Sequence, residues 1–593
     1  MIPRLLMRLL TKKRFIPFVT GIALLAFVAC GGSDTGSSTV ASTSTAVPAA
    51  AAQDSSSGEN SRVAPELRDT ESTSASTNVG TDFESRAGGT FRRLWSDPPT
   101  LDPHQVTDTT SAGLVVELFS GLVKLSKELQ IVPDLAESWE ITGDGKIYTF
   151  TLRENLMFSD GSPITAADFK WSWERAANPD TESTVADVYL GDIVGINAIV
   201  DGDAVSSDGI TVIDERTLRV TIDDAKPYFI AKLTYPTAFV LKQENVEAGG
   251  DRWTDTPVGT GPFVLDDYRV GERIVFARNE NFNHRKAYLD KVLFNLAGGI
   301  AMAMYETDEI DITGVGLADL ERVQDPDEPL NRDLVNIPPG FSISYVGFNT
   351  EKAPFDDMKF RQALNLAVNK ELIAESVYAG LVLPAYGILP PDFPGFTGDI
   401  VGLRFDPDDP EASEARARAV LAESKYADPE TRPRIVITIP GTGGSPSLDV
   451  EIVADMWRNV LGVEAEIQQV EWATYLQDLN RERLQAFGGL GWEADYPDPQ
   501  DFLDILFHSE SPGNHGRFSS DIVDSLVERA RTEPDPQMRI DLYRQAEQEI
   551  ITQAAWLPLW FDTEGKGLIK PYIKDYKFTP IIVPKLGDVW IDK

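Results

Sequence analysis

The chain has 593 residues, a hydrophobic fraction of 42%, a charged fraction of 25% and a formal net charge of −39. This length exceeds what one ordinary core supports, so we expect a globular protein of two or more domains. The acidic balance, with no basic stripe beyond the first fifteen residues, argues against a nucleic-acid partner. One Cys and four His argue against a metal or iron–sulfur cofactor held by several such ligands.

The N-terminus has the pattern of a targeting segment. Five basic residues and no acid precede Ile16 to Val28, an apolar stretch shorter than the about 20 residues that span a membrane. Small residues then lead to Cys30, which resembles the signal of bacterial lipoproteins, where the Cys becomes the lipidated N-terminus. Phe27 departs from the usual Leu of that signal. The alternative is an uncleaved anchor helix, and both place the rest of the chain outside the cytoplasmic membrane.

Residues 31–87 are rich in Ser, Thr, Ala and Gly and nearly lack long apolar side chains. Such a segment cannot bury enough apolar surface to offset the entropy lost on ordering, so we expect a disordered tether. About 55 residues at roughly 5–6 Å × √n reach on the order of 40 Å. The sequence therefore predicts a globular part held near a membrane by a flexible tether.

The ordered chain is expected to begin at Gly88, with a short strand from Phe91 to Trp95. Pro98 and its neighbour Pro99 then force an extended crossing that cannot join a central ladder. His104 follows without a readable acid–thiol or acid–hydroxyl partner set, so we expect a structural role for it. A helix is predicted over Leu114–Leu122.

The next block reads as a compact α+β unit. Alternation over 148–152 has strand period, and 210–222 adds further alternating strands. Thr165 with Asp168 three residues later resembles a capping box, after which Phe169 and Trp173 share one helix face. The glycine-rich 257–263 could be a phosphate cradle, but it lacks the Gly-Lys-Ser/Thr ending and no helix follows, so a turn feeding the strand 263–268 is preferred.

The C-terminal half has the pattern of a parallel sheet. A β-branched run over 435–439, a helix over 447–461 and a strand over 463–470 predict a βαβ unit. Strands are also predicted over 345–349 and 557–561, and helices after the turn 353–356 and over 521–531.

The stretch 491–502 combines three aromatic, two proline and four acidic residues. Asp498 stands before Pro499 and an apolar-periodic run, so we expect it to cap a helix. Asp495 falls on the turn before that helix, where it either closes the turn or presents a carboxylate to a ligand. Trp492 is either a core residue or a pocket wall. A Trp beside a carboxylate suits a cationic ligand with an apolar body.

The ordered set of short segments resembles one family, the extracytoplasmic solute-binding proteins of peptide ABC transporters (oligopeptide- and dipeptide-binding, family 5). The resemblance covers nearly everything from Gly88 onward. Each segment alone is a weak signal and the set is strong. The matching segments are 97–104, 133–139, 148–153, 158–161, 259–263, 348–350, 361–364 and 494–496.

The resemblance implies an α/β fold of two lobes, the periplasmic-binding-protein-like type II fold, with a small extra α+β domain on the N-terminal lobe. It places the two crossings between the lobes near 345–349 and 557–561. The expected division is a signal segment 1–30, a tether 31–87, an N-terminal lobe of 88–130, 257–345 and 562–593, an extra domain 131–256, and a C-terminal lobe 346–561.

The resemblance also implies site residues. Asp495 matches the aspartate that holds a peptide ammonium, with Trp492 as a pocket wall and Tyr496 beside it. Trp95, Ser96 and Asp97 match the segment whose backbone pairs with an extended peptide. Trp560 is a further candidate that could equally be hinge packing. The loop 441–446 and Gly489 carry no cation where some relatives have an Arg for the ligand carboxylate, which favours longer peptides or ligands without a pinned carboxylate.

These expectations combine into a lipid-anchored, monomeric receptor that captures a peptide and delivers it to an ABC permease, without a cofactor. Binding of an oligosaccharide, a nickel chelate or an opine in the same fold stays open, as does a sensing role. An extracytoplasmic hydrolase is the alternative of another class. It is disfavoured because the chain has no Gly-x-Ser-x-Gly elbow, no His-Glu-x-x-His motif and no catalytic Cys.

Overall fold

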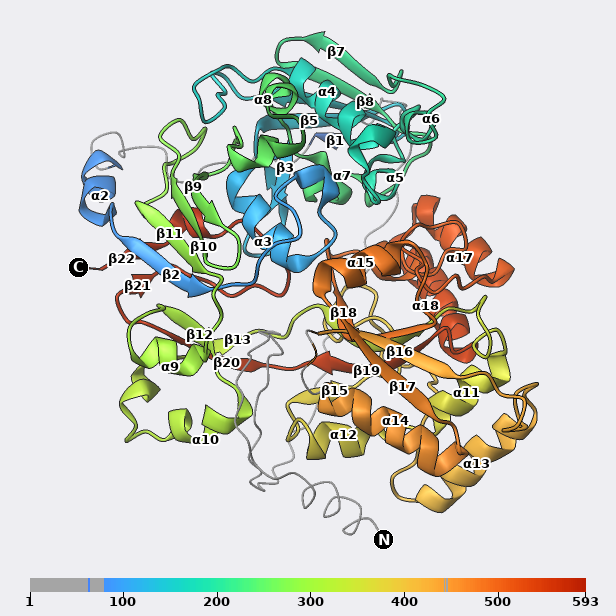
Figure 1. Ribbon diagram of the computed structural model, residues 1–593. Helices are drawn as coiled ribbons and strands as arrows, with labels where there is room; N and C mark the ends of the chain where they lie inside the picture. The colour runs from blue at the N-terminus through green and yellow to red at the C-terminus, as the bar shows by residue number, and fades with distance from the viewer. Residues whose placement is uncertain (1–61, 64–78, 442, 444–445, 593) are drawn as a thin grey trace, which may run out of the picture.

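The structure is a computed structural model that describes residues 62–63, 79–441, 443 and 446–592 (Figure 1). The predicted signal segment and Cys30 lie outside these residues. Among the helices in the described ranges, none has the length and apolar character needed to cross a membrane.

The predicted tether is wrong at two places. Strand β1 (Arg62–Val63) pairs antiparallel with β5 (Ala136–Thr142), and helix α2 (Val79–Arg86) precedes the expected start of the ordered chain. The ring of Phe83 in α2 stacks on Tyr288 with centroids 5.8 Å apart. Composition averaged over 31–87 hid this single aromatic anchor.

The N-terminal lobe contains a four-stranded sheet in the order β2-β11-β10-β9. The predicted strand is β2 (Thr90–Leu94), which pairs parallel with β11 (Lys291–Asn295). The glycine-rich 257–263 leads directly into β9 (Phe263–Arg269), which confirms the turn. Its glycines are needed because a Cβ at Gly259 would lie 2.1 Å from the Leu118 carbonyl oxygen. The sheet is completed by β10 (Arg273–Arg278).

Helix α3 (Thr109–Leu118) replaces the helix predicted over 114–122. Asp108 caps it, since its side chain accepts hydrogen bonds from the backbone N–H of Thr110 (3.0 Å) and Ser111 (3.1 Å). The apolar run 114–116 was recognised, but the capping signal upstream was missed. The chain turns extended at Phe119.

His104 is fully buried, and its ring contacts the Phe239 carbonyl oxygen (3.2 Å) and the Arg175 guanidinium (2.9 Å). Burial and the Arg175 charge lower the pKa of His104 to about 4. Arg175 also binds Asp102 through two nitrogens. His104 is therefore part of a packed structural cluster, as expected.

The segment that follows β4 (Ile131–Pro133) forms the small α+β unit at the top of Figure 1. Its sheet has the strand order β1-β5-β6-β8-β7. Helix α4 (Ala166–Ala177) packs on it, and its capping box is confirmed, because the Asp168 side chain accepts from the Thr165 backbone N–H at 2.7 Å. Trp173 is fully buried and donates to the Ala238 carbonyl (2.9 Å). The other elements are β3 (Val123–Leu125), β4 (Ile131–Pro133), β6 (Ile147–Leu152), β7 (Ile210–Asp214), β8 (Thr217–Thr221), α5 (Ala186–Leu190), α6 (Ile196–Val200), α7 (Phe229–Lys232) and α8 (Gln243–Gly249).

The C-terminal lobe is built on a six-stranded sheet in the order β15-β19-β14-β18-β16-β17. The βαβ unit is confirmed: β16 (Ile435–Pro440) and β17 (Ala465–Val470) are parallel and joined through α14 (Leu448–Leu461). The other elements are β14 (Ser342–Phe348), β15 (Val382–Pro384), β18 (Ala486–Glu493), β19 (Trp556–Asp562), α11 (Met358–Leu366), α12 (Lys370–Ser376), α13 (Pro410–Ala422), α15 (Trp472–Asn480), α16 (Gln500–Leu503), α17 (Asp521–Thr532) and α18 (Pro536–Thr552).

Two adjacent segments join the lobes, a few residues away from the predicted crossings. The chain leaves the three-stranded sheet β12-β20-β13 after β13 (Leu334–Ile337) and returns to it at β20 (Gly565–Ile569). The predicted crossings instead lie within β14 and β19, which are paired central strands of the C-terminal lobe. The remaining elements are β12 (Ile312–Gly314), β21 (Ile573–Lys574), β22 (Trp590–Ile591), α9 (Ala301–Glu306) and α10 (Leu317–Gln324). The expected two-lobed α/β architecture is confirmed.

Candidate ligand-binding site

A cavity of ≈560 Å³ lies where the two lobes and the small α+β unit meet. The N-terminal lobe lines it with α3 and the C-terminal segment 582–588, and the α+β unit contributes the segment around Tyr189 and Tyr235. The C-terminal lobe contributes α15 and the end of β18. Aromatic side chains and carboxylates thus face one enclosed space, which is the form expected of a small-ligand site.

Asp495 and Trp492 both line this cavity, as predicted. Asp495 follows the end of β18, and the Tyr189 hydroxyl from the α+β unit donates a hydrogen bond to its carboxylate. Burial raises the pKa of Asp495 to about 7, although the bond from Tyr189 opposes the rise. The carboxylate therefore sits in a desolvated position with no Lys or Arg of the described residues paired to it. Such a group favours a cation that can replace the lost hydration.

Asp501 holds the backbone of Asp495 in place, and the sequence did not predict this role. Its side chain is fully buried, and one oxygen accepts from the Asp495 backbone N–H (3.1 Å) and from the Trp492 indole N–H (3.2 Å). Its other oxygen has no hydrogen-bond partner among the described residues. Burial, together with the neighbouring charge of Asp495, raises the pKa of Asp501 well above its usual range. Asp501 thus orients both predicted ligand-contacting residues.

The acid side of the cavity extends beyond Asp495. Glu493 on β18 and Asp108 at the start of α3 line the same space. Burial raises the pKa of Glu493 to about 8 and also raises that of Asp108. Neither carboxylate has a salt-bridge partner in the described parts of the chain. A ligand that enters at this wall meets desolvated carboxyl groups, whose ionised form a cation would stabilise.

Three predicted contacts on the N-terminal lobe do not line the cavity. The Trp95 indole N–H donates to the Thr110 carbonyl (3.1 Å), which fixes the ring against α3. Ser96 is exposed to solvent. Asp97 accepts from the Tyr268 hydroxyl (3.1 Å) and the Gly271 backbone N–H (2.6 Å). These partners hold the side chains of Trp95 and Asp97 within the N-terminal lobe, so the cavity gives none of the three predicted ligand contacts support.

The other two predicted residues are also outside the lining. Tyr496 is fully buried, and its hydroxyl donates to the Gln500 side chain. Trp560 is buried in β19 with its ring centroid 4.7 Å from that of Tyr378, which is the packing alternative considered for it. Tyr496 supports the site from beneath, whereas Trp560 belongs to the lobe's core.

Asp498 has the capping role predicted for it. Its side chain accepts from the Gln500 backbone N–H (2.9 Å), the first residue of α16. The same carboxylate binds both terminal nitrogens of Arg539 at 2.7 and 2.8 Å. This bidentate pair ties the loop that carries Asp495 to helix α18.

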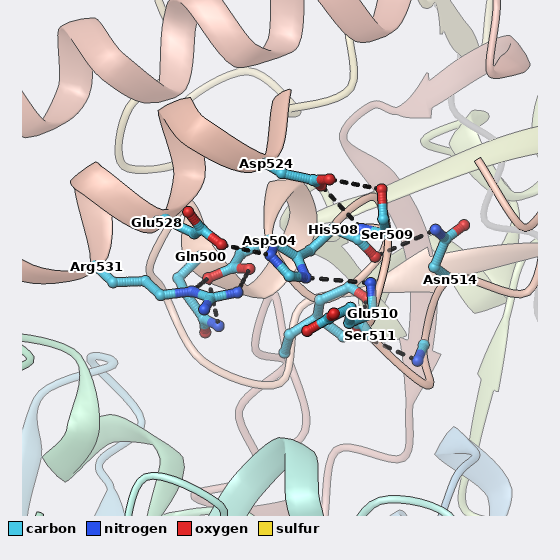
Figure 2. A network of polar contacts seen from close by, with 12 residues as sticks. Gln500, Asp504, His508, Ser509, Glu510, Ser511, Asn514, Asp524, Glu528 and Arg531 are labelled. Atoms are coloured by element: carbon cyan, nitrogen blue, oxygen red, sulfur yellow. Dashed lines mark hydrogen bonds and ion pairs between the residues drawn. The ribbon is translucent and has the colours of Figure 1, made fainter. Parts of the chain in front are cut away.

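A buried polar network lies beneath α16 and α17 (Figure 2). The Gln500 amide donates to Asp504 (3.3 Å), and the Arg531 guanidinium from α17 makes two bonds to the Asp504 carboxylate at 2.7 and 2.8 Å. Burial alone would raise the pKa of Asp504, but Arg531 lowers it below its usual range. Through Gln500 and Tyr496 the network supports the loop that presents Asp495.

The residues that sequence reasoning missed are distant in the chain. Tyr189 lies 306 residues before its partner Asp495. Its apolar surroundings gave no sign that its hydroxyl reaches another lobe. In the ranges that the structure describes, no group of three or more His, Cys, Asp or Glu side chains is placed to hold a metal ion.

Comparison with known proteins places the chain in a family. Residues 130–514 match the model of the bacterial extracellular solute-binding proteins, family 5. The probable deoxycholate-binding periplasmic protein YgiS of Escherichia coli K12 is 35% identical, over 81% of this chain and 88% of that protein. The periplasmic murein peptide-binding protein MppA of the same organism is 32% identical, over 82% and 89%.

The solved structure of E. coli MppA has a TM-score of 0.76 at 29% identity and covers 86% of this chain and 99% of that one. The unliganded open form of MppA has a TM-score of only 0.60, at coverages of 85% and 97%. Both structures are of MppA, so the difference between the two TM-scores reflects how the lobes are arranged in each structure. The chain belongs to the bacterial extracellular solute-binding proteins of family 5, and it is a binding protein rather than an enzyme.

Proposed function

We propose that this chain is the lipid-anchored binding protein of an ABC importer and that it captures peptides by their N-terminal ammonium. The observation that carries the proposal is Asp495, a desolvated carboxylate at the wall of the inter-lobe cavity with no cationic partner among the described residues. A peptide ammonium supplies the missing charge, and Trp492 with Tyr235 offers apolar surface to the first side chains. Delivery to a membrane permease follows from the family's role in transport.

The relatives support a peptide more than a bile acid. MppA is named for a murein peptide, whereas YgiS is named as a probable deoxycholate binder. Deoxycholate is an anion, and an anion placed beside Asp495, Glu493 and Asp108 would be repelled by whichever of these carboxyls is ionised. A cationic amine at this wall is favoured by the same charges.

A closed arrangement of the lobes supports capture by enclosure. The Tyr189 hydroxyl reaches across to Asp495, and the Arg539 guanidinium of the C-terminal lobe lies 5.5 Å from the ring of Tyr228 in the α+β unit. Both contacts join parts that must separate for a ligand to enter. Opening about the segments 338–341 and 563–564 would break them, as in hinge closure around a ligand.

The division into lobes at the predicted residue boundaries is part of this proposal. Lipid anchoring, the other part, rests on the sequence pattern around Cys30. Replacement of Cys30 by alanine is expected to move the protein from the membrane fraction to the soluble fraction of expressing bacterial cells, because the acyl chains attach to this thiol. Immunoblots of the two fractions measure the change. A Cys30→Ala protein that stays with the membrane would contradict lipid attachment at this residue.

Binding of an amine ligand is expected to weaken in acid. The pKa of Asp495 in the empty site is about 7, so a proton occupies the carboxylate below that pH and must leave when the ammonium binds. Asp501, Glu493 and Tyr189 face the Asp495 carboxylate, and burial raises the pKa of each of these three groups as well. The affinity should therefore fall about tenfold per pH unit below pH 7, a range in which the peptide amine stays charged.

Calorimetric titration at pH 7, 6 and 5 measures this slope. An N-acetylated peptide of the same sequence serves as the control and should show a flat profile, because it carries no ammonium. A free-amine peptide whose affinity is constant over these pH values would argue against Asp495 as its partner.

Mass spectrometry of the ligand that co-purifies with the protein tests the proposal most broadly. Peptides with free N-termini are expected. A steroid acid, an oligosaccharide or a metal chelate as the retained ligand would overturn the assignment to peptides and leave the family unchanged.

A further inference from the structure

Three basic side chains with long, flexible stems line the cavity on the side of the N-terminal lobe, namely Lys124, Arg285 and Lys585. Lys124 pairs with Asp134 (2.9 Å), and Arg285 pairs with Asp588. Lys585 has no carboxylate within salt-bridge distance in the described residues, and its ammonium donates only to the Thr579 hydroxyl at 3.2 Å. Lys585 is therefore the lining cation whose charge is available to a ligand.

The position of Lys585 is set by its backbone. The N–H groups of Lys585 and Leu586 both donate to one oxygen of Glu117, at 2.8 and 2.9 Å. Glu117 is buried near the end of α3, so the C-terminal segment is fastened to the helix that forms the cavity roof. One oxygen of the Glu117 carboxylate is thus occupied by backbone donors, and its other oxygen has no hydrogen-bond partner among the described residues.

A second cation adds to the positive charge there. Arg93 also lacks a salt-bridge partner among the described residues, and its guanidinium lies 4.3 Å from the centre of the Trp95 ring. Burial would raise the pKa of Tyr576, yet the charges of Arg93 and Lys585 bring it below its ordinary value. Glu117 compensates only part of this charge. Lys585 therefore makes this side of the cavity positive, and Arg93 adds to that charge from outside the lining.

The opposite wall carries carboxyl groups, and both sides belong to the same cavity. Glu493 has its pKa raised by burial to about 8, but Lys585 pulls it down and Asp495 pushes it up, so both charges act on one side chain. Glu493 precedes Asp495 by two residues, which is about 7 Å along an extended chain. Because Lys585, Glu493 and Asp495 line one cavity of ≈560 Å³, a short ligand can contact both the cation and the ammonium site.

We propose that Lys585 binds a ligand carboxylate located within the first three residues of a peptide whose ammonium is held by Asp495. The ligand is then either a short zwitterionic peptide, through its C-terminus, or a longer peptide with an acidic side chain near its N-terminus. The inference rests on the proposed function. It also changes the sequence-based expectation that no cation pins the ligand, because that expectation considered only the loop 441–446 and Gly489, whereas Lys585 comes from the C-terminal segment.

The test uses calorimetric titration of the full protein with Ala-Ala-Ala, with its C-terminal amide and with Ala-Glu-Ala amide. The wild type should bind at least one carboxylate-bearing peptide at least tenfold more tightly than the tri-alanine amide. Lys585→Met, which keeps the apolar stem, should remove this preference and leave the affinity for the amide unchanged. The two carboxylate peptides identify the source, because Ala-Glu-Ala amide carries its charge on a side chain alone.

Lys577→Met is the matched control. Lys577 lies on the same C-terminal segment, is exposed and pairs with Glu128 outside the cavity. Its loss should therefore change neither the affinity for the carboxylate-bearing peptides nor that for the tri-alanine amide. Equal binding of all three peptides by the wild type would overturn the inference while the proposed function stands. Equal weakening of every peptide by Lys585→Met would also overturn it, because Lys585 would then act on lobe closure through Glu493. Failure of all three peptides to bind would overturn the proposed function and this inference with it.

Discussion

Replacement of Asp495 by alanine is expected to weaken the binding of a free-amine peptide by about 10²- to 10³-fold. The carboxylate is desolvated at the cavity wall and lacks a basic partner in the described chain, so the ligand ammonium is its counter-ion. Removing one partner of a buried charge pair costs about 3–5 kcal/mol, because the other charge stays buried and unpaired. At about 1.4 kcal/mol per tenfold change, this cost corresponds to the stated loss of affinity.

Two further variants separate a ligand contact from a general effect. Asp495→Asn keeps the size of the side chain and removes its charge, so it should lose nearly as much affinity as the alanine variant. Asp521→Ala removes an exposed aspartate at the start of α17 in the same lobe, outside the cavity lining, and should bind like the wild type. An Asp495→Asn protein with unchanged affinity would remove this carboxylate from the ligand site.

The second large effect is on stability. Replacement of Arg531 by methionine is expected to lower the free energy of unfolding by about 3–5 kcal/mol, because Asp504 would remain buried without its partner. Gln500 donates to the same Asp504 carboxylate and connects the pair to the loop of Asp495 (Figure 2). Urea unfolding followed by circular dichroism measures the change.

A double variant and a surface control test the cause. Arg531→Met together with Asp504→Leu replaces both charges by apolar groups and should recover most of the stability, since no unpaired charge is then buried. Arg529→Met on the same helix is exposed and should change stability by less than about 0.5 kcal/mol. A single Arg531 variant as stable as the Arg529 variant would show that the pair contributes little.

The sequence predicted those parts of the fold that local patterns specify. The β-branched run of β16, the helix α14 and the strand β17 gave the parallel unit with boundaries within about two residues. The start of α3 was placed five residues late because the predicted range began at its apolar run and left out the Asp108 cap. The ordered pieces 62–63 and 79–86 were missed because their partners, β5 and Tyr288, are distant in the sequence.

The site was predicted only where its chemistry lies in one stretch. Asp495 and Trp492 were found because a Trp and an uncommitted Asp stand together before a capped helix. Tyr189 and Lys585 come from other parts of the chain and meet the stretch only in the folded protein. Trp95 and Asp97 were expected at the ligand from resemblance, yet α3 and Tyr268 engage their polar atoms. Which of several aromatic or charged residues faces a cavity depends on tertiary packing that local patterns do not contain.

The cavity has opposite charges on its two sides. Asp495, Glu493 and Asp108 supply carboxyl groups on one side, whereas Lys585 supplies a cation on the side formed by the C-terminal segment. Such an arrangement orients a dipolar ligand as well as holding it, because reversal would oppose like charges on both sides. The expectation of a ligand pinned at one terminus is thereby extended to a second point of attachment.

Ligand capture through an N-terminal ammonium is tested most directly by calorimetric titration of the wild-type protein with one peptide and its N-acetylated form. The two ligands differ only in the charge that Asp495 is proposed to bind. The free-amine peptide should bind at least tenfold more tightly at pH 7, a difference of about 1.4 kcal/mol or more. Equal affinity for the two forms would contradict the central role of Asp495 in this cavity.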